Sequence, residues 1–183
     1  LLRFSDLQAY DALGQWQLPT GFEPTGITWE GGLLYLSDYD AMTLYTFDPN
    51  TGALESQFAL SSRPAGLAGT GNGELWVSLV DTNSIQRLDV GTFSSLQTID
   101  EPAAFVRDVD LYRGMLWASD RDNNQAIAMS LADGAIEESY SLDIDEMAGL
   151  EFMEDNLWVV DRENSEIVIF ERLDNKTHFL HKV

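Results

Sequence analysis

A leucine followed by an aromatic residue occurs four times in this sequence, and each occurrence lies 41 residues after the previous one. The four pairs are Leu34-Tyr35, Leu75-Trp76, Leu116-Trp117 and Leu157-Trp158. The same period is kept by an acidic position and by an apolar one, namely Asp40, Asp81, Asp122 and Glu163, and Phe47, Leu88, Met129 and Phe170. A fixed period of this length predicts a repeat architecture, in which the repeat is the unit of folding.

Each repeat is expected to consist of β-strands. In the first repeat, residues 25–29, 33–37, 44–48 and 57–60 are short runs rich in apolar residues, separated by polar turns. One turn, residues 49–52, reads Pro-Asn-Thr-Gly, and these residue types suit tight turns. No stretch has the 3.6-residue apolar spacing of a helix. Four short strands per repeat predict an all-β fold, a β-propeller of four-stranded antiparallel blades.

Three segments carry a resemblance to known repeats: residues 34–40 (LYLSDYD), 116–124 (LWASDRDNN) and 157–164 (LWVVDREN), each followed by an apolar strand. They resemble the blades of NHL repeats, of YWTD repeats and of the SMP-30/gluconolactonase group. The resemblance covers residues 23–183 and concerns the blade, not an active site. WD40 repeats fit less well, because their Gly-His and Trp-Asp signatures are absent.

The repeat predicts one propeller domain over residues 1–183, with four full blades and an N-terminal half blade. The full blades are residues 23–60, 61–101, 102–143 and 144–183. Residues 1–22 predict only the outer half of a blade, because Leu7 aligns with Leu44 in a third strand and residues 15–18 align with a fourth.

Three explanations of the missing inner half are open. In the first, which we favour, the chain is a segment of a longer propeller, and the lack of a Met at position 1 agrees with this. In the second, the half blade pairs with an open edge of another subunit, since unpaired edges template association. In the third, four and a half blades close as a small ring.

The composition is strongly acidic, with 31 Asp and Glu residues against 10 Lys and Arg and a net charge of −21. This charge disfavours nucleic acids and anionic membrane surfaces as partners, since both bind basic patches. The acidic residues have two interpretations, solubility in a salt-rich environment and the binding of cations. The chain has no cysteine, and membrane insertion is not expected because no apolar run reaches about 18 residues. The resemblance implies an extracellular or periplasmic location.

Acidic residues that follow the second strands are candidate metal ligands. They are Asp38, Asp40, Asp120, Asp122 and Asp161. Oxygen ligands in this number suit a hard cation such as Ca²⁺. Because the residues recur in every blade, the alternative that their side chains support turns is favoured.

Residues where loops converge at the mouth of the channel are candidate ligand-binding groups. They are Glu23, Tyr39, Arg63, Arg107, Asp108 and Glu146. Three of them break the repeat: Arg107 and Asp108 replace small residues such as Thr25 and Gly26 of the first blade, and Arg63 lies beside Pro64. Leu79, where other blades carry an aspartate, is a further departure. The alternative for Arg107 and Asp108 is pairing within the acidic ring.

No Ser-His-Asp or Cys-His set can be assembled from the sequence, so an enzyme is not the favoured interpretation. We expect a binding or scaffold module that recognises a protein, peptide or glycan on its loop-rich face. Two alternatives remain open: a calcium-dependent hydrolase of the lactonase kind, as the SMP-30 resemblance implies, and a structural subunit that self-associates through its blade edges.

Overall fold

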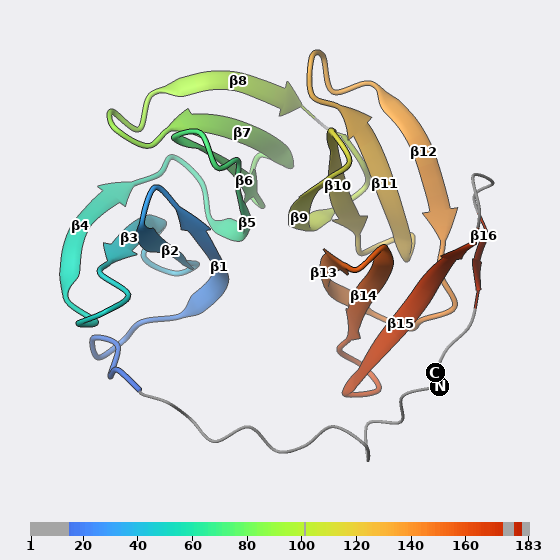
Figure 1. Ribbon diagram of the computed structural model, residues 1–183, viewed down its shortest axis with the longest axis horizontal. Helices are drawn as coiled ribbons and strands as arrows, with labels where there is room; N and C mark the ends of the chain where they lie inside the picture. Colours follow the sequence, from blue (N-terminus) through green and yellow to red (C-terminus); the bar gives the residue numbers. More distant parts are fainter. Residues whose placement is uncertain (1–14, 101, 174–177, 181–183) are drawn as a thin grey trace.

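The computed structural model describes residues 15–100, 102–173 and 178–180. In these residues, sixteen β-strands form four antiparallel four-stranded sheets arranged around a common axis (Figure 1). The predicted all-β propeller class is confirmed. None of the described residues belongs to a helix long and apolar enough to cross a membrane.

The strands of each blade are consecutive in the sequence. Blade 1 comprises β1 (Pro24–Glu30), β2 (Leu33–Asp38), β3 (Thr43–Phe47) and β4 (Leu54–Ala59). Blade 2 comprises β5 (Pro64–Gly69), β6 (Glu74–Leu79), β7 (Ser84–Asp89) and β8 (Ser95–Asp100). Blade 3 comprises β9 (Val106–Tyr112), β10 (Met115–Asp120), β11 (Gln125–Ser130) and β12 (Ile136–Ser141). Blade 4 comprises β13 (Met147–Met153), β14 (Asn156–Asp161), β15 (Glu166–Leu173) and β16 (His178–Leu180). Each sheet pairs its strands in sequence order.

The repeated apolar positions pair with each other across the second and third strands of every blade. Leu34 lies opposite Phe47, Leu75 opposite Leu88, Leu116 opposite Met129, and Leu157 opposite Phe170. Opposite residues in an antiparallel pair share one face of the sheet. The period read from the sequence is therefore the period of one apolar patch on each blade.

Each inner blade packs one face against the blade before it and the other against the blade after it. We call these the rear face and the forward face. Between blades 1 and 2, Tyr35 and Leu44 of the forward face meet Leu67, Leu75 and Val77 of the rear face. Equivalent clusters lie between blades 2 and 3 and between blades 3 and 4. The hydrophobic core is thus divided among the interfaces, and the first strands β1, β5, β9 and β13 lie side by side.

Figure 1 shows an open arc, with an opening between blades 1 and 4. Most of the half blade predicted for residues 1–22 lies outside the described residues. Residues 15–19, which include the predicted fourth strand at 15–18, are not assigned to a strand, because no described strand hydrogen-bonds beside them. Phe22 instead packs on the rear face of blade 1, with its ring centroid 4.6 Å from that of Tyr45 and 6.4 Å from that of Phe47.

Small residues near the start of the first strands let neighbouring blades approach closely. A Cβ atom on Gly66 would lie 2.1 Å from Asp108 Oδ1 and 2.5 Å from Asp108 Cα. A Cβ atom on Gly26 would lie 2.3 Å from the carbonyl oxygen of Ala65. Real Cβ atoms essentially never come closer than 3.0 Å to such neighbours. The glycines are therefore required by the contact between blades.

Gly66→Ala is expected to lower the free energy of unfolding by about 1–3 kcal/mol, because the added methyl group forces blades 2 and 3 apart. Gly91→Ala is the matched control, since a Cβ atom there has only Asp89 Oδ1 nearby, at 3.4 Å. Urea unfolding of both variants checks the difference. Equal stability of the two would show that the blades can separate at no cost.

Candidate functional site

The loops before the first strands and the loops between the second and third strands lie at one end of the propeller. A backbone N–H of each second-to-third loop donates to a carbonyl just before the first strand of the same blade. These bonds join Tyr39 to Glu23 (3.1 Å), Val80 to Arg63 (2.8 Å), Arg121 to Phe105 (2.9 Å) and Arg162 to Glu146 (2.9 Å). We call this end of the molecule the loop face.

Buried carboxylates at the ends of the second strands hold the loop face together. Asp120 accepts the backbone N–H groups of Ala104 and Phe105, both at 3.3 Å. Asp161 accepts the two equivalent N–H groups of blade 4 at 3.1 and 3.3 Å. Asp38 accepts an N–H of its own loop at 3.0 Å. These side chains are thus already engaged as acceptors of backbone hydrogen bonds.

Blade 2 achieves the same loop arrangement without the buried carboxylate. Leu79 occupies that position and is packed in the core between blades 1 and 2. Asp81, two residues later, accepts the backbone N–H of Arg63 at 3.0 Å, and its own N–H donates to Ser62 Oγ at 3.1 Å. The departure at Leu79 is therefore explained by packing and by a relocated acceptor.

The five candidate metal ligands are distributed over the second-to-third loops of three blades. Asp38, Asp120 and Asp161 belong to three different blades and make the bonds given above, while Asp40 and Asp122 are exposed. Within residues 15–100, 102–173 and 178–180, no group of three or more His, Asp or Glu side chains is placed to hold a metal ion. The observed bonds are those of the turn-supporting alternative, and calcium binding stays a prediction.

Asp120→Ala is expected to lower the free energy of unfolding by about 1–3 kcal/mol, because two backbone N–H groups lose the buried carboxylate that accepts their hydrogen bonds. Asp122→Ala is the control, since it removes the same charge from an exposed residue two positions further along the chain. It is expected to change the free energy of unfolding by less than about 0.5 kcal/mol. Urea unfolding with and without Ca²⁺ checks both. A loss at Asp120 that appears only when Ca²⁺ is present would identify a metal ligand instead.

Three of the predicted ligand-binding residues meet on the loop face. The guanidinium carbon of Arg63 lies 4.7 Å from the ring centroid of Tyr39, and that of Arg107 lies 5.7 Å from the same centroid. Arg63 Nε also donates to Asp81 Oδ1 at 2.7 Å. This hydrogen bond, with the positive charge of Arg63, lowers the pKa of Asp81. We call Tyr39, Arg63 and Arg107 the arginine-tyrosine cluster.

Glu146 belongs to a second charged cluster on the loop face. Its Oε1 atom lies 2.6 Å from Arg121 Nη2 and 3.4 Å from Arg162 Nη1. The guanidinium carbon of Arg121 lies 5.7 Å from the ring centroid of Phe105. Glu23, the remaining candidate on this face, has an exposed side chain, and its carbonyl accepts the loop bond of blade 1.

Arg121 and Arg162 were not among the predicted site residues. Both directly follow the repeated aspartate of a second strand, at the position where blade 1 has Tyr39. The dipeptide Asp-Arg occurs in blades 3 and 4, so it looks like part of the repeat, although blades 1 and 2 do not have this dipeptide at the equivalent positions. With Arg63 and Arg107, four of the six arginines whose side chains the structure describes lie on the loop face, so the described positive charges are concentrated there.

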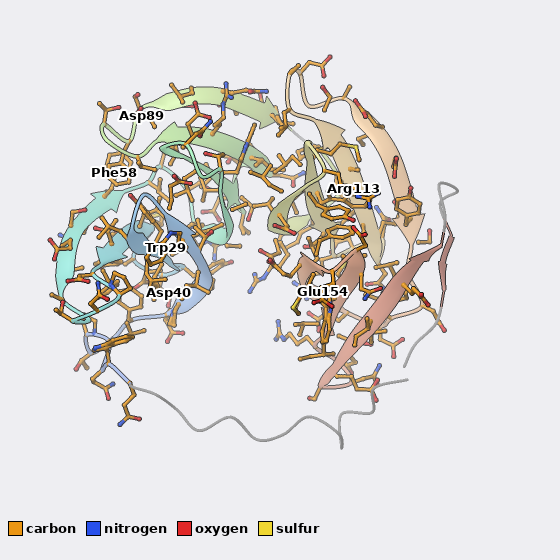
Figure 2. The ribbon with its side chains drawn as sticks, viewed as in Figure 1. Trp29, Asp40, Phe58, Asp89, Arg113 and Glu154 are labelled. Atoms are coloured by element: carbon orange, nitrogen blue, oxygen red, sulfur yellow. The ribbon has the colours of Figure 1, made fainter. Side chains whose placement is uncertain are left out.

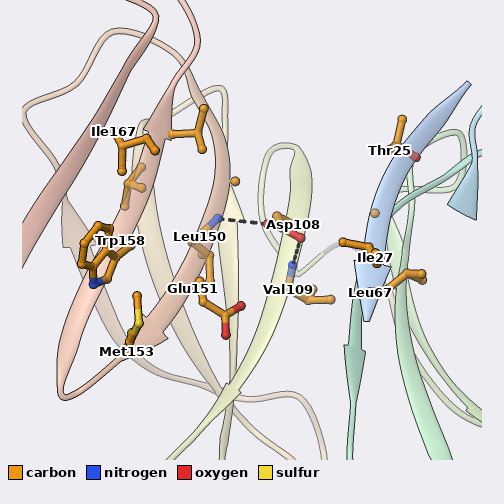
Figure 3. Close-up of a pocket in the computed structure, with 14 residues that line it drawn as sticks. Thr25, Ile27, Leu67, Asp108, Val109, Leu150, Glu151, Met153, Trp158 and Ile167 are labelled. Carbon is orange, nitrogen blue, oxygen red and sulfur yellow. Dashed lines mark hydrogen bonds between the residues drawn. The ribbon is translucent and has the colours of Figure 1, made fainter. Parts of the chain in front are cut away.

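Asp108 does not lie with these residues but joins the first strands of blades 3 and 4. Its Oδ2 atom accepts the backbone N–H of Leu150 at 3.0 Å, and its Oδ1 atom accepts that of Val109 at 3.0 Å (Figure 3). Asp110 accepts the N–H of Phe152 at 2.9 Å in the same way. Burial raises the pKa of Asp108 to about 6, although the N–H groups oppose the shift.

A cavity of about 400 Å³ adjoins Asp108 near the axis. Figure 3 shows Glu151, Met153 and Trp158 of blade 4 on one side and Ile27 of blade 1 on the other. Partial desolvation beside the cavity, together with the nearby charges of Asp110 and Asp108, raises the pKa of Glu151 to about 7, although the residue as a whole is exposed. Glu151 was missed in the sequence, because an acidic residue in so acidic a chain gives no signal.

The raised pKa values make stability depend on pH. A carboxyl with a folded pKa near 7 and an ordinary value of 4.5 binds more protons in the folded state between these limits. The free energy of unfolding is therefore expected to rise as the pH falls from about 8 to about 5. Glu151→Gln should flatten this rise, because glutamine does not titrate.

Glu137→Gln is the control for net charge, since Glu137 is exposed on β12, the outermost strand of blade 3. It should leave the pH dependence close to that of the unaltered chain. Urea unfolding at several pH values measures both variants. An unchanged slope in Glu151→Gln would show that Glu151 titrates in the folded protein as it does in the unfolded chain.

The comparisons with known proteins concern the fold. No protein-family model matches the sequence, and no curated protein is similar to it in sequence. The glutaminyl cyclase of Myxococcus xanthus is similar in structure, with a TM-score of 0.71 and 13% identity over 83% of this chain and 67% of that chain. Streptogramin B lyase gives a TM-score of 0.64 and 23% identity over 83% and 52%. The WD40 propeller domain of Doa1 gives 0.61 and 16% over 78% and 48%.

The chain spans about half the length of the last two proteins. At these identities the likeness shows a shared fold alone. The three names include a cyclase, a lyase and a WD40 domain, so the fold does not select a function. The chain is therefore a β-propeller whose function has to be argued from its own surface.

Proposed function

We propose that this propeller is a binding module that recognises a protein or peptide through its loop face, with an acidic group of the partner bound at Arg107. One observation carries the proposal. Arg107 lies against the Tyr39 ring, yet it forms no ion pair with any carboxylate in the described part of the chain.

An arginine without a carboxylate partner is unexpected in this chain, where acidic residues outnumber basic ones 31 to 10. The other arginines of the loop face are all paired: Arg63 with Asp81, and Arg121 and Arg162 with Glu146. A guanidinium that stacks on a ring keeps its N–H groups available for a carboxylate. Arg107 is thus the loop-face cation that an acidic partner can engage.

The surroundings of Arg107 are suited to a binding site. Tyrosine and arginine are enriched among residues that dominate binding energy. Arg63, fixed by Asp81, lies against the same Tyr39 ring as Arg107, so the ring is held in place before a ligand arrives. Groups that are ordered in advance lose less conformational entropy on binding.

The resemblance of the blades to NHL and YWTD repeats supports the same class of function, and an extracellular or periplasmic location is part of the proposal. A glycan with acidic groups would present the same chemistry to Arg107. We favour a peptide, because the arginine-tyrosine cluster offers one cationic contact beside an aromatic surface, which suits an acidic side chain followed by an apolar one.

Selection of displayed random peptides on the immobilised chain tests the proposal. The selected peptides are expected to carry Asp, Glu or a free C-terminal carboxylate. Arg107→Ala should weaken the binding of a selected peptide by at least about tenfold, since it removes a charge-assisted hydrogen bond. Replacing the acidic residue of the peptide by its amide should have the same effect.

Arg113→Ala is the matched control. Arg113 also lies over an aromatic ring, that of Tyr112 at 5.3 Å, and pairs with Asp155 at 2.9 Å, but it belongs to the turn between β9 and β10 at the opposite end of the blade. Its replacement should leave peptide binding unchanged. Selected peptides without acidic groups, or equal losses in both arginine variants, would refute the proposal.

A further inference from the structure

The cavity beside Asp108 lies between the two blades at the ends of the arc. Blade 4 contributes Glu151, Met153 and Trp158, and blade 1 contributes Ile27 (Figure 3). The volume of about 400 Å³ falls within the range of about 300–1,000 Å³ that is usual for small-molecule sites. The cavity is therefore large enough to hold a small organic molecule.

The walls of the cavity are mainly apolar, and several of them are exposed. Ile27 is 63% exposed, whereas Leu67 and Leu150, which pair with the same position of their second strands, are 6% and 4% exposed. On the side of blade 4, Ile167 is 41% exposed. Trp29, labelled in Figure 2, lies on the same face of β1 as Ile27 and is 56% exposed. An apolar ligand body that covered these side chains would remove them from water.

The carboxylate of Glu151 has no partner in the described part of the chain. It takes part in no hydrogen bond or ion pair there. Thr28 and Asp110 are its equivalents in blades 1 and 3, since all three lie opposite the aromatic residue of a second strand. Each of these two accepts a backbone N–H of the following blade at 2.9 Å, from Gly69 and Phe152. The oxygens of Glu151 are thus available to a ligand.

A hydrogen-bond donor of the cavity also lacks a partner. The Nε1 atom of Trp158 is buried, and no described residue accepts its N–H. Trp158 pairs directly with Glu151 across β13 and β14, so the two side chains lie on one face of the sheet. A buried donor without an acceptor costs free energy, and a ligand oxygen bound there would remove this cost.

The charges around the cavity favour a cation. Asp108 lines the cavity together with Glu151, and Asp110 is close enough to act on the same carboxyl. The lining residues from β1, β5, β14 and β15 carry no charge, and no described lysine or arginine lines the cavity. Of the groups that shift the pKa of Asp108, Arg107 has the smallest effect. The negative potential of the two carboxyls therefore attracts a positively charged group and repels an anion.

We propose that this cavity binds a small amphipathic amine. The protonated amino group binds the carboxylate of Glu151, and a neutral oxygen of the ligand accepts the N–H of Trp158. The apolar part of the ligand lies against Ile27 and Ile167. The arginine-tyrosine cluster takes no part in this site, so the proposal stands independently of the proposed peptide site.

Four probes that differ in one group test the proposal. Phenylalaninol carries all three features, whereas phenylpropanol lacks the amine, phenylethylamine lacks the hydroxyl and ethanolamine lacks the ring. Binding is followed by nuclear magnetic resonance at about pH 8, where Glu151 is mostly ionised and the amines are still protonated. The readout is the indole N–H signal of Trp158, which Trp158→Phe identifies by its loss.

Phenylalaninol is expected to bind and to move the Trp158 signal. Phenylpropanol should bind at least about tenfold more weakly, because it has no charge for Glu151. Phenylethylamine should bind at least about threefold more weakly, because it offers Trp158 no acceptor. Ethanolamine should not bind detectably, since it has no apolar body to cover the walls.

Four variants, compared by calorimetry, assign each contact. Glu151→Gln should weaken phenylalaninol binding by at least about tenfold and leave phenylpropanol binding unchanged. Trp158→Phe should make phenylalaninol and phenylethylamine bind equally well. Ile27→Ser, at an exposed position, should weaken phenylalaninol and phenylpropanol alike. Glu137→Gln removes the same charge as Glu151→Gln from the outer strand β12 and should change neither affinity.

The affinity for phenylalaninol should also fall by about tenfold between about pH 8 and about pH 6, because protonation removes the charge of Glu151. Most of this dependence should disappear in Glu151→Gln, and Asp108 accounts for the rest. The proposal fails if millimolar phenylalaninol leaves the Trp158 signal in place, or if any of the other three probes binds as tightly. Equal weakening by Glu151→Gln and Glu137→Gln would also overturn it, since it would show attraction to the net charge alone.

Discussion

The packing of one blade against the next is the interaction on which this structure depends. Each second strand is apolar on both sides, as Leu75 on the rear face and Trp76 on the forward face illustrate, and both are almost fully buried. A sheet of this kind is stable only between two other layers. Side-chain acceptors such as Thr28 and Asp110 then fix how neighbouring first strands align. Stability is therefore shared along the arc and is lowest where a face has no neighbour.

The sequence predicts the repeating part of this arrangement well, because the period acts within a blade. Leu116 and Met129, found from spacing alone, are paired and fully buried. The contacts between blades could not be predicted, since they depend on how far one sheet turns relative to the next. Asp108 was identified as a departure from the repeat, but its bond to Leu150 of the following blade has no signature in the spacing.

Departures from the repeat proved to be of two kinds. Leu79 departs for structural reasons, because Asp81 and Ser62 make the loop contacts that an aspartate makes elsewhere. Arg107 also departs from the repeat, but its side chain takes over no hydrogen bond of this kind. Tyr39 and Arg63 were identified separately in the sequence, and the structure places the three side chains together. A break in a repeat therefore indicates function only where no neighbouring residue has taken over the structural role. The sequence alone cannot make that distinction, because the substitute can lie anywhere in the loop.

The concentration of arginines on one face has a consequence for how a partner would be bound. A net charge of −21 repels an acidic partner at long range, and this repulsion is screened over about 10 Å at moderate salt. The attraction to Arg107 acts only at contact and is also weakened by salt. The two effects oppose each other, so added salt would increase the rate of association while weakening the bound state. An acidic protein with most of its described arginines on one face would thus gain selectivity from contact geometry, and it would give up the electrostatic steering that fast association requires.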